Sequence, residues 1–210
     1  MQTHFQKTRH ALAASPAIAL VAGAIALVVL QPVPAEAQGF GVRAGAVSGE
    51  NGTIAGSRSV MSNGQGGGAV RRNFAVGDGQ GNGTAWSGIC AANINAAGCS
   101  GRAATWSADG SFSGVAGTEI AGDNGFFSGN RTLDRDPDGS WSGSSAVEAS
   151  GQNGSYNGSA SFNDGTYSRG AVYSGADGQS ATVEGTYEIG SGGSRIVTCI
   201  DASGAMVECP

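Results

Sequence analysis

The chain has almost no lysine or histidine. Its only lysine, Lys7, and both histidines, His4 and His10, lie in the first ten residues, and the 173 residues after Ala37 contain neither type. Such a segment cannot form a Ser-His-Asp or Cys-His site, a histidine-ligated metal site, a Schiff base or the lysine of a phosphate-binding loop. Catalysis by carboxylates alone is the enzymatic chemistry that remains open.

Large apolar side chains are also scarce. Residues 38–210 contain 25 Leu, Ile, Val and Phe, about 14% of the segment, whereas packing of a globular core becomes doubtful below roughly 20%. The net charge of this segment is only −6, from nine Arg and fifteen Asp or Glu, so charge does not favour disorder. Its 37 glycines permit close backbone contacts. We therefore expect a thin sheet or a repeating stack.

The first 37 residues have the features of a secretory signal peptide. Lys7 and Arg9 precede a mostly apolar stretch, Ala11 to Leu30, and Ala35-Glu36-Ala37 fits small-x-small cleavage before Gln38. Because the apolar stretch approaches the roughly 20 residues of a membrane helix, an uncleaved anchor is the alternative. We predict cleavage, a secreted, periplasmic or cell-surface protein, and no membrane span in the mature chain.

Turn-forming pairs recur along the mature chain. They are Asn51-Gly52, Asn63-Gly64, Asp78-Gly79, Ala97-Gly98, Asp109-Gly110, Asn124-Gly125, Asp138-Gly139, Asn153-Gly154, Asp164-Gly165 and Asp177-Gly178. Asn-Gly and Asp-Gly favour type I′ hairpin turns, in which both central residues have positive φ. From Gly110 the intervals between successive pairs are 15, 14, 15, 11 and 13 residues. This spacing predicts a repeat of hairpins.

The segments after several turns alternate small polar residues with aromatic ones, which is typical of strands. The alternation predicts one face that carries Phe112, Trp141, Tyr156 and Tyr167 and an opposite face of Ser, Thr and Asn. Glycine interrupts every candidate helix after Leu30. The expected fold is all-β: a glycine-rich repetitive β-meander or β-solenoid with short Asn-Gly and Asp-Gly turns and almost no helix.

Composition divides the mature chain into two parts. Residues 38–83 are richer in glycine and poorer in aromatic residues, which indicates either a flexible glycine-rich leader or weak β-repeats. Residues 84–210 form the aromatic-containing β-repeat region.

Four cysteines, Cys90, Cys99, Cys199 and Cys209, follow the predicted export signal, so disulfide pairing is the expected state. Three connectivities exist. We predict the two local pairs, Cys90 with Cys99 and Cys199 with Cys209, because each encloses a glycine-containing turn. Crosslinks of this size stabilise by about 2.5 to 3 kcal/mol in the chain-entropy model. A zinc or redox site is the alternative, but the chain lacks Cys-x-x-Cys spacing.

The segment Asp134 to Gly139 reads Asp-x-Asp-x-Asp-Gly and resembles the start of calcium loops in EF-hands, dockerins and thrombospondin-type repeats. The resemblance implies a calcium site formed by Asp134, Asp136, Asp138 and Ser142. A solvated acidic turn is the alternative, because Pro137 and Gly139 favour a turn by themselves. Calcium is the only cofactor that the sequence suggests.

Aromatic side chains on a flat strand face are candidate stacking residues for sugar rings. The candidates are Trp86, Trp106, Trp141, Tyr156 and Tyr167. The alternative is that they supply the main apolar packing of the sheet, because Leu and Ile are scarce.

These features favour an exported, non-enzymatic structural or cell-surface β-repeat protein that self-associates or adheres, because exposed strand edges pair readily and no lysine blocks them. The alternative is a carbohydrate-binding module. The expected partner is therefore a second copy or a cell-surface polysaccharide. Nucleic acid is not expected, because the net charge is negative and Arg71-Arg72 is the only basic pair. A glycosidase is disfavoured, since glycine-rich repeats rarely shape a deep cleft.

Overall fold

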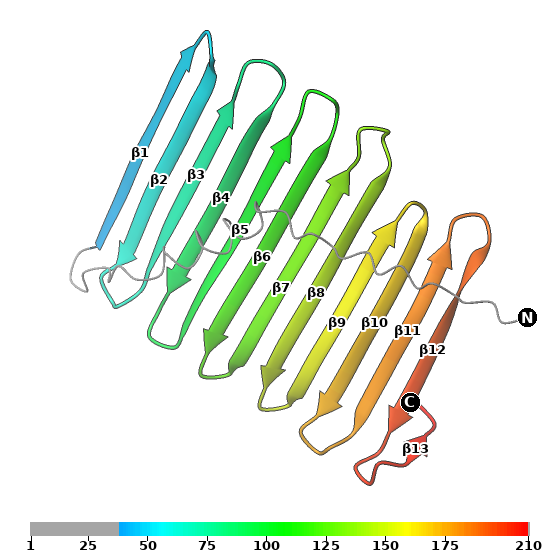
Figure 1. Ribbon diagram of the computed structural model, residues 1–210. Coiled ribbons are helices and arrows are strands. Elements are labelled where there is room, and N and C mark those ends of the chain that lie inside the picture. Colours follow the sequence, from blue (N-terminus) through cyan, green and yellow to red (C-terminus); the bar gives the residue numbers. More distant parts are fainter. Residues whose placement is uncertain (1–37, 210) are drawn as a thin grey trace, which may run out of the picture.

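The computed structural model describes residues 38–209, so the predicted signal peptide lies outside the described residues. Within this range thirteen antiparallel strands form one open sheet, and no helix occurs (Figure 1). Each strand pairs only with its neighbours in sequence, from β1 at one edge to β13 at the other. The all-β prediction is confirmed, and the arrangement is a β-meander.

Twelve long strands and one short strand make up the sheet. Their bounds are β1 (Gln38–Gly49), β2 (Gly52–Asn63), β3 (Gly68–Gly77), β4 (Gly83–Ala92), β5 (Ala96–Trp106), β6 (Phe112–Gly122), β7 (Gly125–Arg135), β8 (Trp141–Gly151), β9 (Gly154–Asn163), β10 (Thr166–Gly175), β11 (Ser180–Glu188), β12 (Gly192–Ile200) and β13 (Met206–Val207). At about 3.3 Å per residue the long strands measure roughly 30 to 40 Å. The glycine-rich segment 38–83 therefore contributes β1, β2 and β3 to the same sheet.

Four hairpins close through one kind of five-residue turn. In each, the first residue donates its N–H to the carbonyl of the fifth, and a glycine at the fourth position, with φ between 85° and 92°, donates to the carbonyl of the first. This is a type I turn followed by a left-handed residue, which glycine adopts without strain. The turns span residues 107–111, 136–140, 175–179 and 201–205.

The tight turns differ from the predicted type I′ geometry in most cases. Gly52, Gly125 and Gly154 have φ of 121°, 138° and 133°, but each is the first residue of the following strand, and the asparagine before it does not have positive φ. Within residues 38–209 the only non-glycine residue with positive φ is Asp164 (42°). Asp164-Gly165 is therefore the one pair in which both residues are left-handed, as a type I′ turn requires.

The prediction of a turn at Ala97-Gly98 is wrong, because both residues lie inside β5. The chain turns earlier, at Asn93 to Asn95. There Asn93 Oδ1 accepts hydrogen bonds from the backbone N–H groups of Asn95 and Ala96, both at 2.8 Å. An asparagine side chain thus supplies the acceptor that closes this turn, which is the usual reason for asparagine in such positions.

The sheet has almost no interior. Ala171, 3% exposed, is the only buried apolar side chain among residues 38–209, and many large apolar residues are exposed. Backbone ladders between successive strands supply most of the interactions that hold the fold. This thin architecture agrees with the scarcity of aliphatic residues in the sequence.

Two disulfides join neighbouring segments of the sheet. Cys90 of β4 and Cys99 of β5 face each other directly in the register, with Cα atoms 4.0 Å apart. Cys199 of β12 is bonded to Cys209, with Cα atoms 5.4 Å apart, so this bond ties the segment after β13 to the sheet. These are the two predicted pairs, and each crosslinks one hairpin.

Strand alternation gives the sheet two different faces. Phe112 lies opposite Arg135, which lies opposite Trp141, and the register continues on the same side to Tyr156 and Tyr167. We call this side the aromatic face and the other side the polar face. On the polar face of β8, β9 and β10 the corresponding positions are mostly Ser, Thr and Asn. The predicted separation of aromatic and small polar residues is therefore present from β8 to β10, whereas on β7 Phe126 lies on the polar face.

Several aromatic rings on this face lie close to glycines. The Trp106 ring covers Gly83, its partner across the β4–β5 pair, and the rings of Phe112, Phe127 and Tyr156 each lie over the glycine two residues further on. A Cβ on Gly83 would lie 2.6 Å from Cε2 of Trp106 and 2.8 Å from the carbonyl oxygen of Val76. Glycine is thus needed at Gly83 and Gly158, where a Cβ would overlap the ring, whereas at Gly129 the nearest Phe127 atom would be 3.5 Å away, an ordinary contact.

This packing predicts a difference between two Gly→Ala variants. Gly83→Ala should lower the free energy of unfolding by about 1 to 3 kcal/mol, because the methyl group overlaps the ring and a backbone oxygen. The matched control is Gly170→Ala, where the nearest atom is Ser159 Oγ at 3.9 Å. It should be neutral or stabilising by up to about 1 kcal/mol. Urea unfolding followed by circular dichroism measures both, and equal effects would contradict the packing role.

Candidate functional site

The aromatic face is the richest surface of the molecule in candidate binding side chains. Tyr156 and Tyr173 pack with ring centroids 4.8 Å apart, and Phe112 and Trp141 with centroids 6.3 Å apart. These rings stay accessible: Trp141 is 40% exposed. They therefore pack laterally against each other while one side of the layer remains open to solvent.

The five predicted sugar-stacking residues do not all share one face. Trp106, Trp141, Tyr156 and Tyr167 lie on the aromatic face, on strands β5, β8, β9 and β10. Trp86 lies on the polar face, where it packs against Phe74 with centroids 6.2 Å apart. Alternation alone did not reveal this, because the strands are joined by turns of different lengths.

Arginines on the aromatic face form a row across the sheet. Arg102 lies opposite Ala116, which lies opposite Arg131, and the same row continues through Ser145 and Ala160. It then reaches Arg169 on β10 and Arg195 on β12. All four arginines are exposed. Sequence reasoning missed this row, because its successive members lie 29, 38 and 26 residues apart in the chain and only the register aligns them.

Charge is segregated between the two faces. The aromatic face carries two further arginines, Arg71 and Arg135, and no acidic residue within its strands. The acidic residues of the strands all lie on the polar face, and they are Glu119, Asp134, Glu148, Glu184 and Glu188. The polar face also carries three arginines at the β1 end, Arg43, Arg58 and Arg72.

The arginines of the aromatic face make few contacts within the chain. Arg102 Nε donates a hydrogen bond to Ser87 Oγ at 3.1 Å, and the guanidinium of Arg135 lies 5.6 Å from the centre of the Trp141 ring. Within residues 38–209 no carboxylate forms an ion pair with an arginine of this face. Four exposed cations are therefore available in the row without an acidic partner in the same chain.

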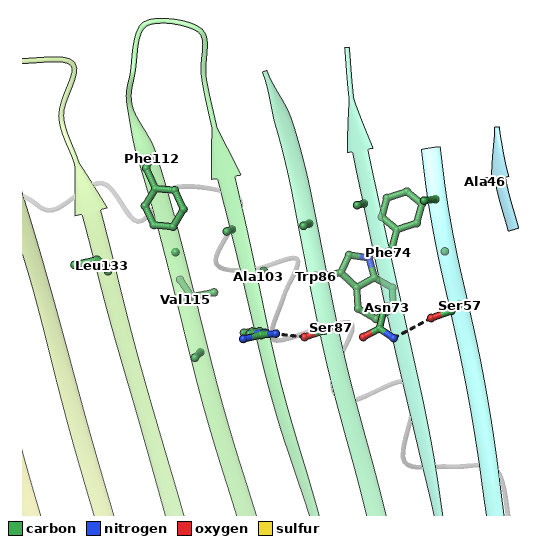
Figure 2. Close-up of a pocket in the computed structure, with 18 of the residues that line it drawn as sticks. Ala46, Ser57, Asn73, Phe74, Trp86, Ser87, Ala103, Phe112, Val115 and Leu133 are labelled. Atoms are coloured by element: carbon green, nitrogen blue, oxygen red, sulfur yellow. Dashed lines mark hydrogen bonds between the residues drawn. The ribbon is translucent and has the colours of Figure 1, made fainter. Parts of the chain in front are cut away.

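A shallow depression of about 1220 Å³ lies over β1 to β7. Small side chains form much of its floor, including Ala46, and Phe112 and Leu133 stand at one end (Figure 2). Asn73 Nδ2 donates to Ser57 Oγ across the floor at 2.9 Å. The depression is broad and open, so it suits a flat surface better than a small molecule, which usually binds in an enclosing cleft.

The candidate calcium ligands occupy two different places. Asp134 and Ser142 are opposite each other in the β7–β8 register. Asp136 and Asp138 lie in the turn, where the Ser140 hydroxyl donates to Asp138 Oδ1 at 2.7 Å and to Asp136 Oδ2 at 3.3 Å. Among residues 38–209 no three His, Cys, Asp or Glu side chains are grouped so as to hold a metal ion.

Turn chemistry accounts for the aspartate at position 138. The backbone N–H of Ser140 donates to Asp138 Oδ1 at 2.9 Å, and this bond, followed by the Ser140 hydroxyl, lowers the pKa of the Asp138 carboxyl below its ordinary value. Asp109 accepts the same bond from Ser111 in an equivalent turn, and its pKa is lowered for the same reason. Calcium binding stays a prediction.

A comparison of the chain with protein families, with curated proteins and with solved structures found no match. In the described range, 38–209, no helix of the length and apolarity needed to cross a membrane is present.

The calcium prediction is checked by thermal unfolding in EDTA and in millimolar calcium. If the ion binds, calcium should raise the melting temperature through mass action, and Asp136→Ala should abolish the rise. Asp109→Ala, in a turn of the same build without neighbouring carboxylates, should leave the rise intact. Identical melts in the two buffers would leave the segment as an acidic turn.

Proposed function

We propose that this chain is an exported, non-enzymatic structural or cell-surface protein that self-associates. The observation that carries the proposal is the lack of an interior: within residues 38–209 Ala171 is the only buried apolar side chain, while many large apolar side chains are exposed. Folded domains normally bury apolar surface between two packed layers, and large exposed patches mark interaction sites. A second copy is a partner that the chain always has at hand, and it would supply the missing layer or extend the sheet.

The oxidising compartment that the disulfides indicate supports the proposal. Two disulfides are typical of an oxidising environment outside the cytosol. The apolar segment and small-x-small site before Gln38 favour export as the route to that environment. A structural role also needs no histidine or lysine, the two residue types that residues 38–210 lack.

The β1 edge of the sheet is open to pairing. The Asn63 N–H donates to the carbonyl of Gly67, so the odd-numbered residues of β2 bond toward β3 and the even-numbered ones toward β1. Through the β1–β2 register, Phe40, Val42, Ala44 and Ala46 direct their backbone groups outward. No proline or lysine interrupts this strand, so it lacks two of the common devices that block edges.

The opposite edge is partly covered. β13 pairs with only two residues of β12, Cys199 and Ile200, and the Cys199–Cys209 disulfide holds the segment that contains β13. Residues Gly192–Thr198 of β12 have no strand on their outer side. A very short, crosslinked edge strand limits pairing at one end of this edge.

Self-association is tested by sedimentation equilibrium and light scattering on the oxidised protein over a hundred-fold concentration range. The weight-average mass should rise with concentration above that of one chain. A compact monomer with a constant mass over the whole range would contradict the proposal.

A carbohydrate-binding module is the second candidate function, and the accessibility of the aromatic face favours it. Trp106 and Trp141 are 38% and 40% exposed, so sugar rings have access to the indoles. Both tryptophans lie on the aromatic face, whereas Trp86 lies on the polar face.

Tryptophan fluorescence tests this second candidate with a built-in control. Soluble glycans and peptidoglycan fragments should change the emission of wild type and of Trp86→Phe, while Trp141→Phe should reduce the response, because the removed indole lies on the binding face. An unchanged spectrum across the panel would remove the support for carbohydrate binding.

A further inference from the structure

We propose that copies of this chain stack face to face, the aromatic face of one on the polar face of the next, through pairs of arginine and glutamate. The inference rests on the proposed self-association and names the surfaces that carry it. The occupant of the aromatic face is thus a second copy of the same chain. The argument rests on the spacing of charges on the two faces, on their segregation and on the area available.

The two faces carry opposite charges at matching intervals. On the aromatic face Arg102, Arg131 and Arg169 lie on β5, β7 and β10, which are two and then three strands apart. On the polar face Glu119, Glu148 and Glu184 lie on β6, β8 and β11, at the same intervals of two and three strands. All six side chains are exposed. A stack displaced by one strand, about 4.8 Å, therefore places each arginine over a glutamate.

The position along the strands fixes the second displacement. Glu119 and Glu148 lie in the same row across the sheet as Cys99. Arg102 lies three residues further along β5 than Cys99, so the arginine row and the glutamate row are about 10 Å apart along the strands. Glu184 lies opposite Gly170, next to Arg169. The offset along the strands between Arg169 and Glu184 is therefore about two residues smaller than the offset in the other two pairs. Packed sheets rotate by up to about 30° relative to each other, and such a rotation absorbs a difference of this size.

The direction of the displacement is set by like charges. In the proposed displacement each strand on the aromatic face of one copy lies over the strand numbered one higher on the polar face of the next copy. The polar-face arginines Arg43, Arg58 and Arg72 then face no strand that carries an arginine on its aromatic side. The opposite displacement places β3, which carries Arg71 on the aromatic face, over β2, which carries Arg58 on the polar face. The opposite displacement also places Arg102 over β4, which carries no glutamate. Charge complementarity of this kind sets register and excludes wrong arrangements.

The area is sufficient for a stable contact. Twelve strands at about 4.8 Å and about ten residues at about 3.3 Å give each face roughly 1,900 Å². The two displacements leave roughly 1,200 Å² per copy, above the approximately 800 Å² per partner of a typical stable interface. Because the two surfaces differ, the contact is heterologous and continues from copy to copy instead of closing as a dimer.

Charge reversal tests the pairing. Arg131→Glu and Glu148→Arg should each weaken association by roughly ten-fold or more, because each puts like charges together. An equimolar mixture of the two variants should associate like wild type, since every contact then joins an arginine to a glutamate. The double variant should also recover. Arg195→Glu is the matched control: β12 extends past the last long strand of the displaced partner, so association should be unchanged.

The outcomes separate this inference from the proposed function. A wild-type protein that is monomeric at all concentrations overturns both. A wild type that associates while the two reversals have no effect, or while their mixture fails to recover, overturns the stack and leaves self-association standing. Ala44→Pro provides the last comparison, because it removes an outward N–H of β1 without breaking the β1–β2 ladder. If Ala44→Pro abolishes association while Arg131→Glu and Glu148→Arg do not, the result would overturn stacking in favour of edge pairing.

Discussion

The backbone hydrogen-bond ladder between adjacent strands is the interaction on which this molecule depends. In this single layer almost no apolar side chain is fully buried, so the usual stabilisation by a hydrophobic core is small. The ladder, the lateral contacts among side chains on each face and two disulfides replace it. This dependence also explains why the turns are short and well defined. A sheet that is held by its hydrogen-bond ladder needs every strand to be placed in register by the loop before it.

Glycine and aromatic residues form one packing unit in this sheet. A glycine gives a ring room to lie along the strand, and the ring in turn covers a stretch of backbone that a glycine leaves bare. The rings at these positions therefore project less from the strands than they would over larger residues. A flat surface of this kind can meet another flat surface over a wide area, which links the glycine content of the chain to the proposed assembly.

The sequence was sufficient to predict an all-β fold of repeated hairpins, because turn pairs and alternation are local signals, but only the strand order decided between a meander and a solenoid. The prediction failed at Ala97-Gly98, because the chain turns earlier, at Asn93 to Asn95, where the Asn93 side chain closes the turn. It also failed at the Asn-Gly loops, where only the glycine has positive φ. It also missed the arginine row. Arg131 and Arg169 are 38 residues apart, and their alignment depends on the lengths of every intervening strand and turn, which only the register supplies.

The purely sequential strand order has a consequence for how the sheet is built. Every strand pairing joins elements that are adjacent in the chain, so stability is close to a sum of hairpin and neighbour contributions. Folding then requires no long loop closure and can spread from any hairpin that forms first. Removal or duplication of two successive strands preserves strand direction and the identity of both faces, so the length of such a sheet can change by whole hairpins without a change of architecture.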